Sequence, residues 1–403
     1  MLPLAATAAL ATVSLLDLEG ATIVGETNPT YASWTIDSSY NRGFVHTDFS
    51  NENLLAGATS LAPSTMRFGG GGNDYLHYEA AAPCNSSADN DLAVCLNASH
   101  WNALYTMANK SGTSFLFGVS FDMAQACIDK SNYRWDPTQT VAMIKFIQQH
   151  GQTMWGFELG NEVNNRMKSC SLEPAQQAQA FTTFAKEIAT LYPDASTRPK
   201  LIGPDVGYLD PELWLGGLLG NLSASDTTLH AVTYHVYSWL SKRNWNFTMP
   251  NDNSLRDGED WYVPMVKKIA PGAEVWAGED GPISGGEDGT CGQNTSVCGT
   301  YATTMWYAND LGARALAGFK QYQRQDLIGG RYGLMGIPHD NEALGKADPV
   351  TLHPDYWVAF MWKRVMGNKV FNATAAAATV LNPMLRVHGH WYVHAAIRFP
   401  TAT

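Results

Sequence analysis

Short apolar runs alternate with amphipathic segments along most of this sequence. Eight runs are rich in β-branched and aromatic residues, at 31–37, 64–70, 114–120, 153–161, 199–205, 231–237, 273–280 and 316–325. Their apolar character is nearly continuous, as in strands buried on both faces of a parallel sheet. Segments 138–151 and 174–192, which lie between such runs, carry helical periodicity.

This β/α rhythm predicts an α/β fold, a (β/α)8 TIM barrel over residues 29–366. The helix predicted at 353–367 closes it. The structural alternative is an open, doubly wound sheet with a dinucleotide site. The glycine run at 69–72 lacks the G-x-G-x-x-G spacing of such a site, so we favour the barrel.

The two ends of the chain predict a separate β-layer. Residues 367–380 and 383–397 have the pattern of strands, with Asn382-Pro383 as the turn between them. Two strands are not stable alone, and a third run of this kind lies near the N-terminus. We therefore expect a small, partial β-sandwich from residues 10–28 and 367–403 beside the barrel.

Several features indicate the secretory pathway. The apolar run at 2–16 is too short to span a bilayer but suits a signal peptide, although no basic residues precede it, and we assign residues 1–9 to a signal-peptide remnant. Seven asparagines stand in N-x-S/T sequons, namely Asn85, Asn97, Asn109, Asn221, Asn246, Asn294 and Asn372. We expect an N-glycosylated protein that is extracellular or lies in the lumen of the secretory pathway, a vacuole or a lysosome.

The six cysteines predict disulfides rather than a metal site. The expected pairs are Cys84 with Cys95, Cys127 with Cys170, and Cys291 with Cys298. No CxxC motif or Cys/His cluster with zinc spacing occurs in the sequence. We predict neither a metal nor an organic cofactor.

The charge balance excludes some classes of partner. The formal net charge is -11, and such a chain is repelled by nucleic acids and by anionic membrane surfaces. We therefore expect no nucleic-acid partner and see no indication of membrane association. The 13 tryptophans suit the flat faces of sugar rings, although most tryptophans lie in protein cores.

Two glutamates are the candidate catalytic residues. Glu162 comes just after the fourth predicted strand, in MWGFELGNEV at 154–163, and Glu279 ends the seventh. Strand ends meet at the mouth of a barrel, and two carboxylates roughly 5 Å apart are what a retaining glycosidase requires. Alternatively, each glutamate is a salt-bridge partner at a strand end. We expect Glu158, inside the strand, to pair with a buried arginine such as Arg67.

The segments around these glutamates carry a resemblance. WGFELGNEVN and VWAGEDGPISGG resemble the acid/base and nucleophile segments of the heparanase-like retaining β-glucuronidases of glycoside hydrolase family 79. Further similar segments follow in order along most of the chain, namely SWTID, MRFGG, LIGPDVG, VTYHVY, RQDLIGGRYGL and HPDYWVAFMWKRVMGNKV. The resemblance implies a retaining glycosidase on a TIM barrel.

The resemblance also implies roles for the residues near the catalytic pair. Glu162 is the acid/base, Asn161 the donor to the sugar 2-hydroxyl, and Glu279 the nucleophile. Tyr237 is expected to hydrogen-bond Glu279, with His235 on the same wall. The alternative for Tyr237 and His235 is a satisfied pair in the protein core.

Five further positions match contacts to the sugar. The backbone N–H groups of Gly285 and Gly286 hold the uronic carboxylate, unless these glycines form a flexible loop. Gln325 and Tyr332 match further carboxylate contacts, and Asp37 matches a hydroxyl acceptor on the first strand.

Departures from the family narrow the expected substrate. The cleft segments of this chain have few basic residues, whereas heparanase carries Lys/Arg clusters there, and Tyr208 stands where the family has a polar amide. We predict a glucuronide or a weakly charged uronic-acid glycan as substrate. The alternatives are a related barrel glycosidase for a neutral sugar and an inactive carbohydrate-binding or cell-wall protein.

Overall fold

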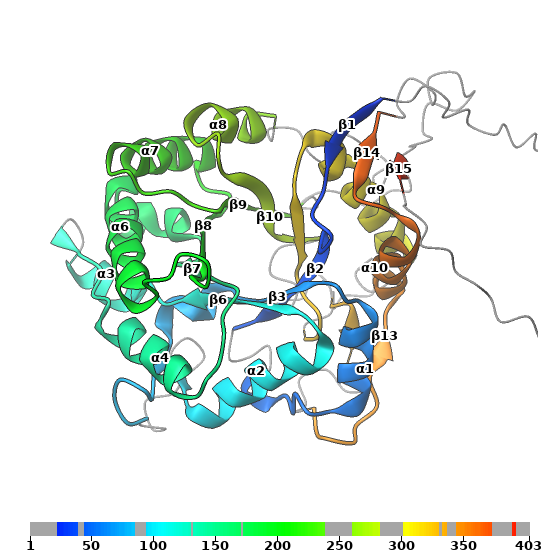
Figure 1. Cartoon of the computed structure of the whole chain (residues 1–403), viewed down its shortest axis with the longest axis horizontal. Coiled ribbons are helices and arrows are strands. Elements are labelled where there is room, and N and C mark those ends of the chain that lie inside the picture. Colours follow the sequence, from blue (N-terminus) through cyan, green and yellow to red (C-terminus); the bar gives the residue numbers. More distant parts are fainter. Residues whose placement is uncertain are drawn as a thin grey trace, which may run out of the picture.

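Eight parallel strands close into a barrel in a computed structural model that describes residues 22–38, 44–84, 94–129, 132–170, 172–237, 260–282, 301–329, 333–336, 344–372 and 389–391. The strands are β2 (Ala32–Asp37), β3 (Thr65–Gly69), β6 (Ser114–Val119), β7 (Gly156–Leu159), β8 (Lys200–Val206), β9 (Ala231–Tyr237), β10 (Glu274–Gly281) and β11 (Gln321–Arg324). They follow one another in chain order, and β11 pairs with β2 to close the ring (Figure 1). The predicted TIM barrel is confirmed, because each of the eight predicted strands forms one strand of the barrel.

Helices surround the barrel (Figure 1). The longer ones are α1 (Glu52–Ser60), α2 (Ala98–Ser111), α4 (Thr138–Gln149), α6 (Pro174–Leu191), α7 (Pro211–Ala224), α8 (Tyr262–Ile269), α9 (Tyr301–Ala317) and α10 (Pro354–Val365). Shorter elements are η2 (Phe44–His46), η3 (Gly71–Tyr75), α3 (Met123–Asp129), η6 (Val163–Arg166) and α5 (Met167–Cys170), with strands β4 (His77–Tyr78), β5 (Cys95–Leu96), β12 (Met335–Gly336) and β13 (Thr351–Leu352). The three helices expected from the sequence correspond to α4, α6 and α10.

Helix α6 shows how sequence sets these elements. Glu173 and Gln176 form a reciprocal capping box at its start, and Pro174 occupies the first turn. Phe181, Phe184 and Ile188 recur at helical spacing and are buried. The helix therefore lays one apolar face against the barrel wall.

The inside of the barrel changes character along its axis. Leu116, Ile202 and Trp276, on alternate strands, form a buried apolar layer, and Trp155 stacks on Trp276 at 5.6 Å between ring centroids. Further toward the carboxyl ends of the strands the interior side chains are polar, beginning with the buried Arg67. The polar groups at this mouth lie above the apolar layer, and a second buried polar cluster of Ser33, Thr65 and Gln321 lies on β2, β3 and β11.

Segments from both ends of the chain pair beside α9 and α10 (Figure 1). Strand β1 (Ile23–Glu26) is antiparallel to β14 (Lys369–Phe371), which is antiparallel to β15 (Gly389–Trp391). This small sheet confirms that the two ends form one β-layer. The remainder of the expected sandwich, including the turn at Asn382-Pro383, lies outside the described residues.

Two of the predicted disulfides are present. Cys84 is bonded to Cys95 and Cys127 to Cys170, whereas the expected pair of Cys291 and Cys298 lies outside the described residues.

Four of the sequon asparagines lie within the described residues. Asn109, Asn221 and Asn372 are exposed, and Asn97 is half-buried. No helix in the described ranges combines the length and apolar character that a membrane span requires.

Candidate active site

The two candidate carboxylates face each other at the mouth of the barrel. Glu162 follows β7 and Glu279 lies near the end of β10. One oxygen of each lies within 4.8 Å of the other, and a ring nitrogen of His235 lies within the same distance of both. Retaining glycosidases hold their two carboxyl groups roughly 5 Å apart, because the second one attacks the sugar directly, whereas inverting enzymes hold them further apart to admit a water molecule.

Arg67 on β3 organises the buried side of the site. Its guanidinium donates to Glu158 Oε2 at 2.7 Å and to Glu279 Oε2 at 3.0 Å, so the expected Glu158–Arg67 pair is confirmed. It also reaches Asn161 Oδ1 at 3.0 Å and Asp205 Oδ2 at 3.3 Å. A single buried cation thus positions four side chains from three strands and their loops.

The sequence makes room for this guanidinium at Gly69. A Cβ atom on Gly69 would lie 2.3 Å from Arg67 Cζ, well inside van der Waals contact. A larger residue here would displace Arg67, so this glycine is required by close packing.

Glu279 is held from two sides. Arg67 contacts Oε2, and the hydroxyl of Tyr237, at the end of β9, donates to Oε1. The hydrogen bond expected from Tyr237 is therefore present. Both donors favour an oriented carboxylate, which is the form that a nucleophile needs.

Glu162 sits in an unusual backbone conformation. Its φ is +50°, in the left-handed region that glutamate seldom adopts, and its N–H donates to the carbonyl of Asp205 at 2.8 Å. Asn165 Nδ2 donates to Glu162 Oε2 at 2.6 Å. Burial alone would raise the pKa of Glu162, but His235, Arg166 and Asn165 together hold it below its ordinary value.

Glu158 and Asp205 form a buried carboxyl pair beneath the mouth. Burial raises the pKa of Glu158 to about 8 against the opposing effect of Arg67, and the neighbouring Asp205 raises it further. Burial would also raise the pKa of Asp205, but Arg67 and His235 hold it well below its usual range. These opposite shifts favour the proton on Glu158 and the charge on Asp205.

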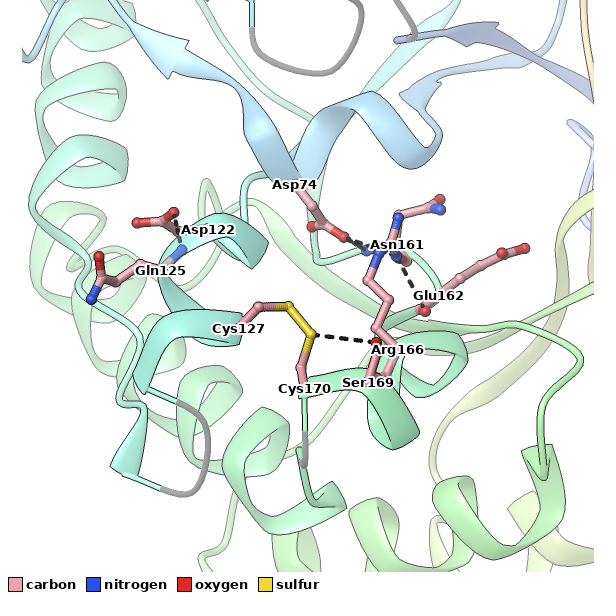
Figure 2. The surroundings of a disulfide bond; sticks show 9 residues. All are labelled: Asp74, Asp122, Gln125, Cys127, Asn161, Glu162, Arg166, Ser169 and Cys170. Carbon is pink, nitrogen blue, oxygen red and sulfur yellow. Dashed lines mark hydrogen bonds and ion pairs between the residues drawn. A yellow bond between two sulfur atoms is a disulfide. The ribbon is translucent and has the colours of Figure 1, made fainter.

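A second framework supports the loop after β7 (Figure 2). Asp74, on η3, accepts from the backbone N–H of Asn161 at 3.0 Å and from that of Phe121 at 3.1 Å. Burial raises the pKa of Asp74 to about 6, while Arg166, 4.0 Å away, opposes the rise. Arg166 also donates to the carbonyl of Asn161 at 3.1 Å. These contacts tie the ends of β6 and β7 together just before Glu162.

The disulfide between Cys127 and Cys170 closes this framework, since it joins α3 to α5 on the loop that carries Glu162 (Figure 2). It links positions 43 residues apart, so replacing both cysteines by serine is expected to lower the free energy of unfolding by about 2–4 kcal/mol. We also expect lower kcat, because the Glu162 loop loses its anchor. Replacing Cys84 and Cys95 is the matched control and should cost stability alone. Equal kcat for the two double variants would contradict this role.

Asp37 and Gln325 lie together beside the candidate carboxylates. Gln325 follows β11, and its side-chain amide donates to Asp37 Oδ2 at the end of β2. Its backbone N–H donates to the carbonyl of Asp280, next to Glu279, at 2.8 Å. The predicted sugar contacts on β2 and β11 thus belong to the same mouth as Glu279.

The other predicted sugar contacts, Gly285, Gly286 and Tyr332, lie outside the described residues. Sequence reasoning missed three polar residues that shape the site, namely Asp74, Asn165 and Asp205. Asp205 carried a usable signal, because it is a carboxylate at the end of a predicted strand, like the two candidate glutamates.

Glu162, His235 and Glu279 would also be the ligands of a cation if one bound here. Two features oppose this. The Arg67 guanidinium lies 3.0 Å from Glu279, and His235 presents both ring nitrogens to carboxylates. We therefore assign no metal ion to these side chains.

Comparison with known proteins assigns the chain to a family. Residues 28–312 match the family described as Glycosyl hydrolase family 79, N-terminal domain. Heparanase-like protein 3 of Arabidopsis thaliana is 27% identical over 352 residues, which are 82% of this chain and 61% of that protein. Baicalin-beta-D-glucuronidase of Scutellaria baicalensis is 26% identical over 366 residues, 81% of this chain and 64% of its own length. The chain thus spans less than two thirds of either relative.

Solved structures share the fold. A 4-O-alpha-L-rhamnosyl-beta-D-glucuronidase of Fusarium oxysporum 12S has a TM-score of 0.59 at 14% identity, covering 86% of this chain and 72% of its own. The GH51 arabinofuranosidase of Xanthomonas axonopodis pv. citri has a TM-score of 0.59 at 12% identity, covering 87% and 75%. The family match covers more than half of the 403 residues, and the chain belongs to glycosyl hydrolase family 79.

Proposed function

We propose that this protein is a retaining β-glucuronidase that hydrolyses a glucuronide or a uronic-acid glycan. The observation that carries the proposal is the pair of carboxylates, Glu162 and Glu279, with oxygens within 4.8 Å of each other at the barrel mouth. The arginine and tyrosine donors on Glu279 support its role as nucleophile.

The first step forms a glycosyl-enzyme. A Glu279 oxygen attacks the anomeric carbon, the bond to the glycosidic oxygen breaks, and that oxygen takes a proton from Glu162. Asn161 Oδ1 already accepts from Arg67, so its amide nitrogen is the group that can donate to the sugar 2-hydroxyl.

The second step releases the sugar. Glu162, now ionised, accepts a proton from water as the water oxygen bonds to the anomeric carbon and the bond to Glu279 breaks. Two displacements at one carbon retain the β-configuration. Glu162 ends protonated, ready for the next cycle.

The proposed sugar rests on the relatives and on predicted contacts. One relative is named as a glucuronidase, and the neighbouring Asp37 and Gln325 match family contacts to the sugar. The backbone of Gly285 and Gly286, with Tyr332, is expected to complete the contacts to the uronic carboxylate.

A panel of chromogenic glycosides tests the proposal. We expect hydrolysis of 4-nitrophenyl β-glucuronide and much slower hydrolysis of the β-glucoside and α-arabinofuranoside. Preference for a neutral sugar would reassign the substrate. If the folded protein cleaved none of them, the inactive carbohydrate-binding alternative would be favoured.

Replacing Glu162 by alanine is expected to have an effect that depends on the aglycone. A 2,4-dinitrophenolate leaves without a proton, whereas an alkoxide does not, so the loss in kcat/KM should reach about 10²–10⁴-fold only for poor leaving groups. The measurement is kcat/KM across aglycones of increasing pKa. A uniform loss would argue that Glu162 is not the acid.

Small glucuronides are expected to be better substrates than heparan sulfate. The net charge is -11, and Asp210 and Glu212 are exposed beside the loop after β8. A long sulfated polymer is therefore repelled, most strongly at low salt, where the Debye length is roughly 30 Å at 0.01 M. We expect no retention on immobilised heparin at physiological salt. Heparan sulfate cleavage that accelerates as salt is removed would contradict this expectation.

A further inference from the structure

His235 lies on the same wall as Tyr237, as the resemblance implies, and its ring is engaged by the protein. Its side chain is only 1% exposed. Its Nδ1 lies 3.0 Å from Glu162 Oε1 and its Nε2 lies 3.0 Å from Asp205 Oδ1. Both ring nitrogens are therefore engaged within the protein, and neither is left to contact a substrate.

The identity of these partners favours a proton on each ring nitrogen. An ionised carboxylate only accepts hydrogen bonds, and a neutral imidazole has one N–H and one lone pair. While Glu162 and Asp205 are both ionised, a neutral His235 would therefore set its lone pair against a carboxylate oxygen at 3.0 Å. With a proton on each nitrogen, the ring donates to both carboxylates.

The surrounding charges favour the same form. Glu279 Oε2 lies 3.9 Å from Nδ1 and is a third carboxylate around the ring. Burial would lower the pKa of His235, but Glu279, Asp205 and Glu162 raise it to about 10. Behind these groups, Arg67 contacts Asp205 and Glu279, and burial raises the pKa of Glu158, which neighbours Asp205.

The next inference rests on the proposed function. We propose that His235 is a permanently protonated residue, held by Asp205, that positions the acid/base Glu162. Its positive charge makes Glu162 a stronger acid and a weaker base. Asp205 suits this task, because its carboxylate is fixed by Arg67 and its backbone N–H donates to Thr233 Oγ1 at 2.8 Å. Arg166 and Asn165, the other polar neighbours of Glu162, act in the same direction.

The proposal has different consequences for the two chemical steps. Glycosylation needs protonated Glu162, and a nearby cation confines that form to more acidic pH. Deglycosylation needs ionised Glu162, which the cation favours. The charge on His235 thus biases the free enzyme toward acidic conditions for attack on the substrate, while the glycosyl-enzyme keeps its base ionised.

Replacing His235 by glutamine tests the charge directly. The pH profile of kcat/KM reports groups of the free enzyme, so its basic limb should move to higher pH by about one unit or more for an alkyl glucuronide. For a dinitrophenyl glucuronide, which needs no acid, the limb set by Glu162 should be absent in both proteins. Replacing His230, which precedes β9, by glutamine is the matched control and should leave the profile in place. A limb that does not move in the His235 variant would overturn the proposal.

Protonation of the ring is also measurable without any substrate. In ¹⁵N NMR spectra of the wild-type protein at about pH 7, both nitrogens of His235 should show the imidazolium form. The signal is assigned by its absence from spectra of the His235→Gln variant. In the Asp205→Asn variant the signal remains, but the pKa of His235 should fall. A neutral ring in the wild type would overturn the proposal. This NMR measurement needs no turnover. If the protein hydrolysed no glucuronide, the proposed function would be rejected, but the protonation state of His235 would still be decided by the spectra.

Discussion

Replacing Glu279 by glutamine is expected to lower kcat by at least about 10⁴-fold for every substrate, whatever its leaving group. The reason is that each turnover passes through a bond between this side chain and the sugar. Glutamine has nearly the same shape, its oxygen can accept from Arg67 and its amide nitrogen can donate to the Tyr237 hydroxyl oxygen, so the fold should persist. The measurement is kcat for nitrophenyl and dinitrophenyl glucuronides, with circular dichroism as the check on folding.

The same strand offers a matched control. Glu274 begins β10 at the opposite end of the barrel, where it accepts from Asn28 at 2.7 Å and from Trp276 at 2.8 Å. Replacing Glu274 by glutamine should leave kcat close to that of the wild type. A Glu279→Gln protein that still turned over the dinitrophenyl substrate at a normal rate would remove Glu279 from the mechanism.

Replacing Arg67 by methionine is expected to affect both stability and activity. The substitution leaves the charges of Asp205 and Glu279 without their buried cation, and breaking such a network costs about 3–5 kcal/mol of unfolding free energy. We also expect a large fall in kcat, because Glu279 and Asn161 lose their common donor. Chemical denaturation and steady-state kinetics measure the two effects.

Two other variants separate charge from geometry. Arg67→Lys keeps the charge, but one ammonium group cannot reach all four acceptors, so we expect stability between that of methionine and the wild type. Arg364, which is exposed on α10 and donates to the carbonyl of Ser60 at 3.0 Å, is the control. Arg364→Met should change the unfolding free energy by only about 0.5 kcal/mol. An Arg67→Met protein as stable as this control would contradict the network.

The fold was predictable because its signals are local. Each strand is a short apolar run buried on both faces, and helices such as α6 carry their own caps and periodicity. Barrel closure then follows from the number and order of the units. The joining of the two chain ends was also predictable, since two strands alone are not stable and needed a partner from elsewhere.

The site was predictable only where a residue follows from its place on a strand. Glu162 and Glu279 stand at strand ends, and Arg67 was the expected partner of Glu158. The contacts that tune these groups join residues far apart in the chain. The hydrogen bonds that His235 makes to Asp205 and to Glu162 span 30 and 73 residues, so no periodicity reveals them. His235 could therefore be placed at the mouth from its strand, but its charge could not be inferred.

Covalent labelling with an activated 2-deoxy-2-fluoro-β-glucuronide tests the central claim most directly. The fluorine slows both displacements while the good leaving group lets the first proceed, so the glycosyl-enzyme accumulates. Mass spectrometry of the digested protein should find a single sugar on the peptide that contains Glu279, and Glu279→Gln should take up no label. A sugar attached to any other residue, or first-formed product of inverted configuration, would contradict the double displacement between Glu162 and Glu279.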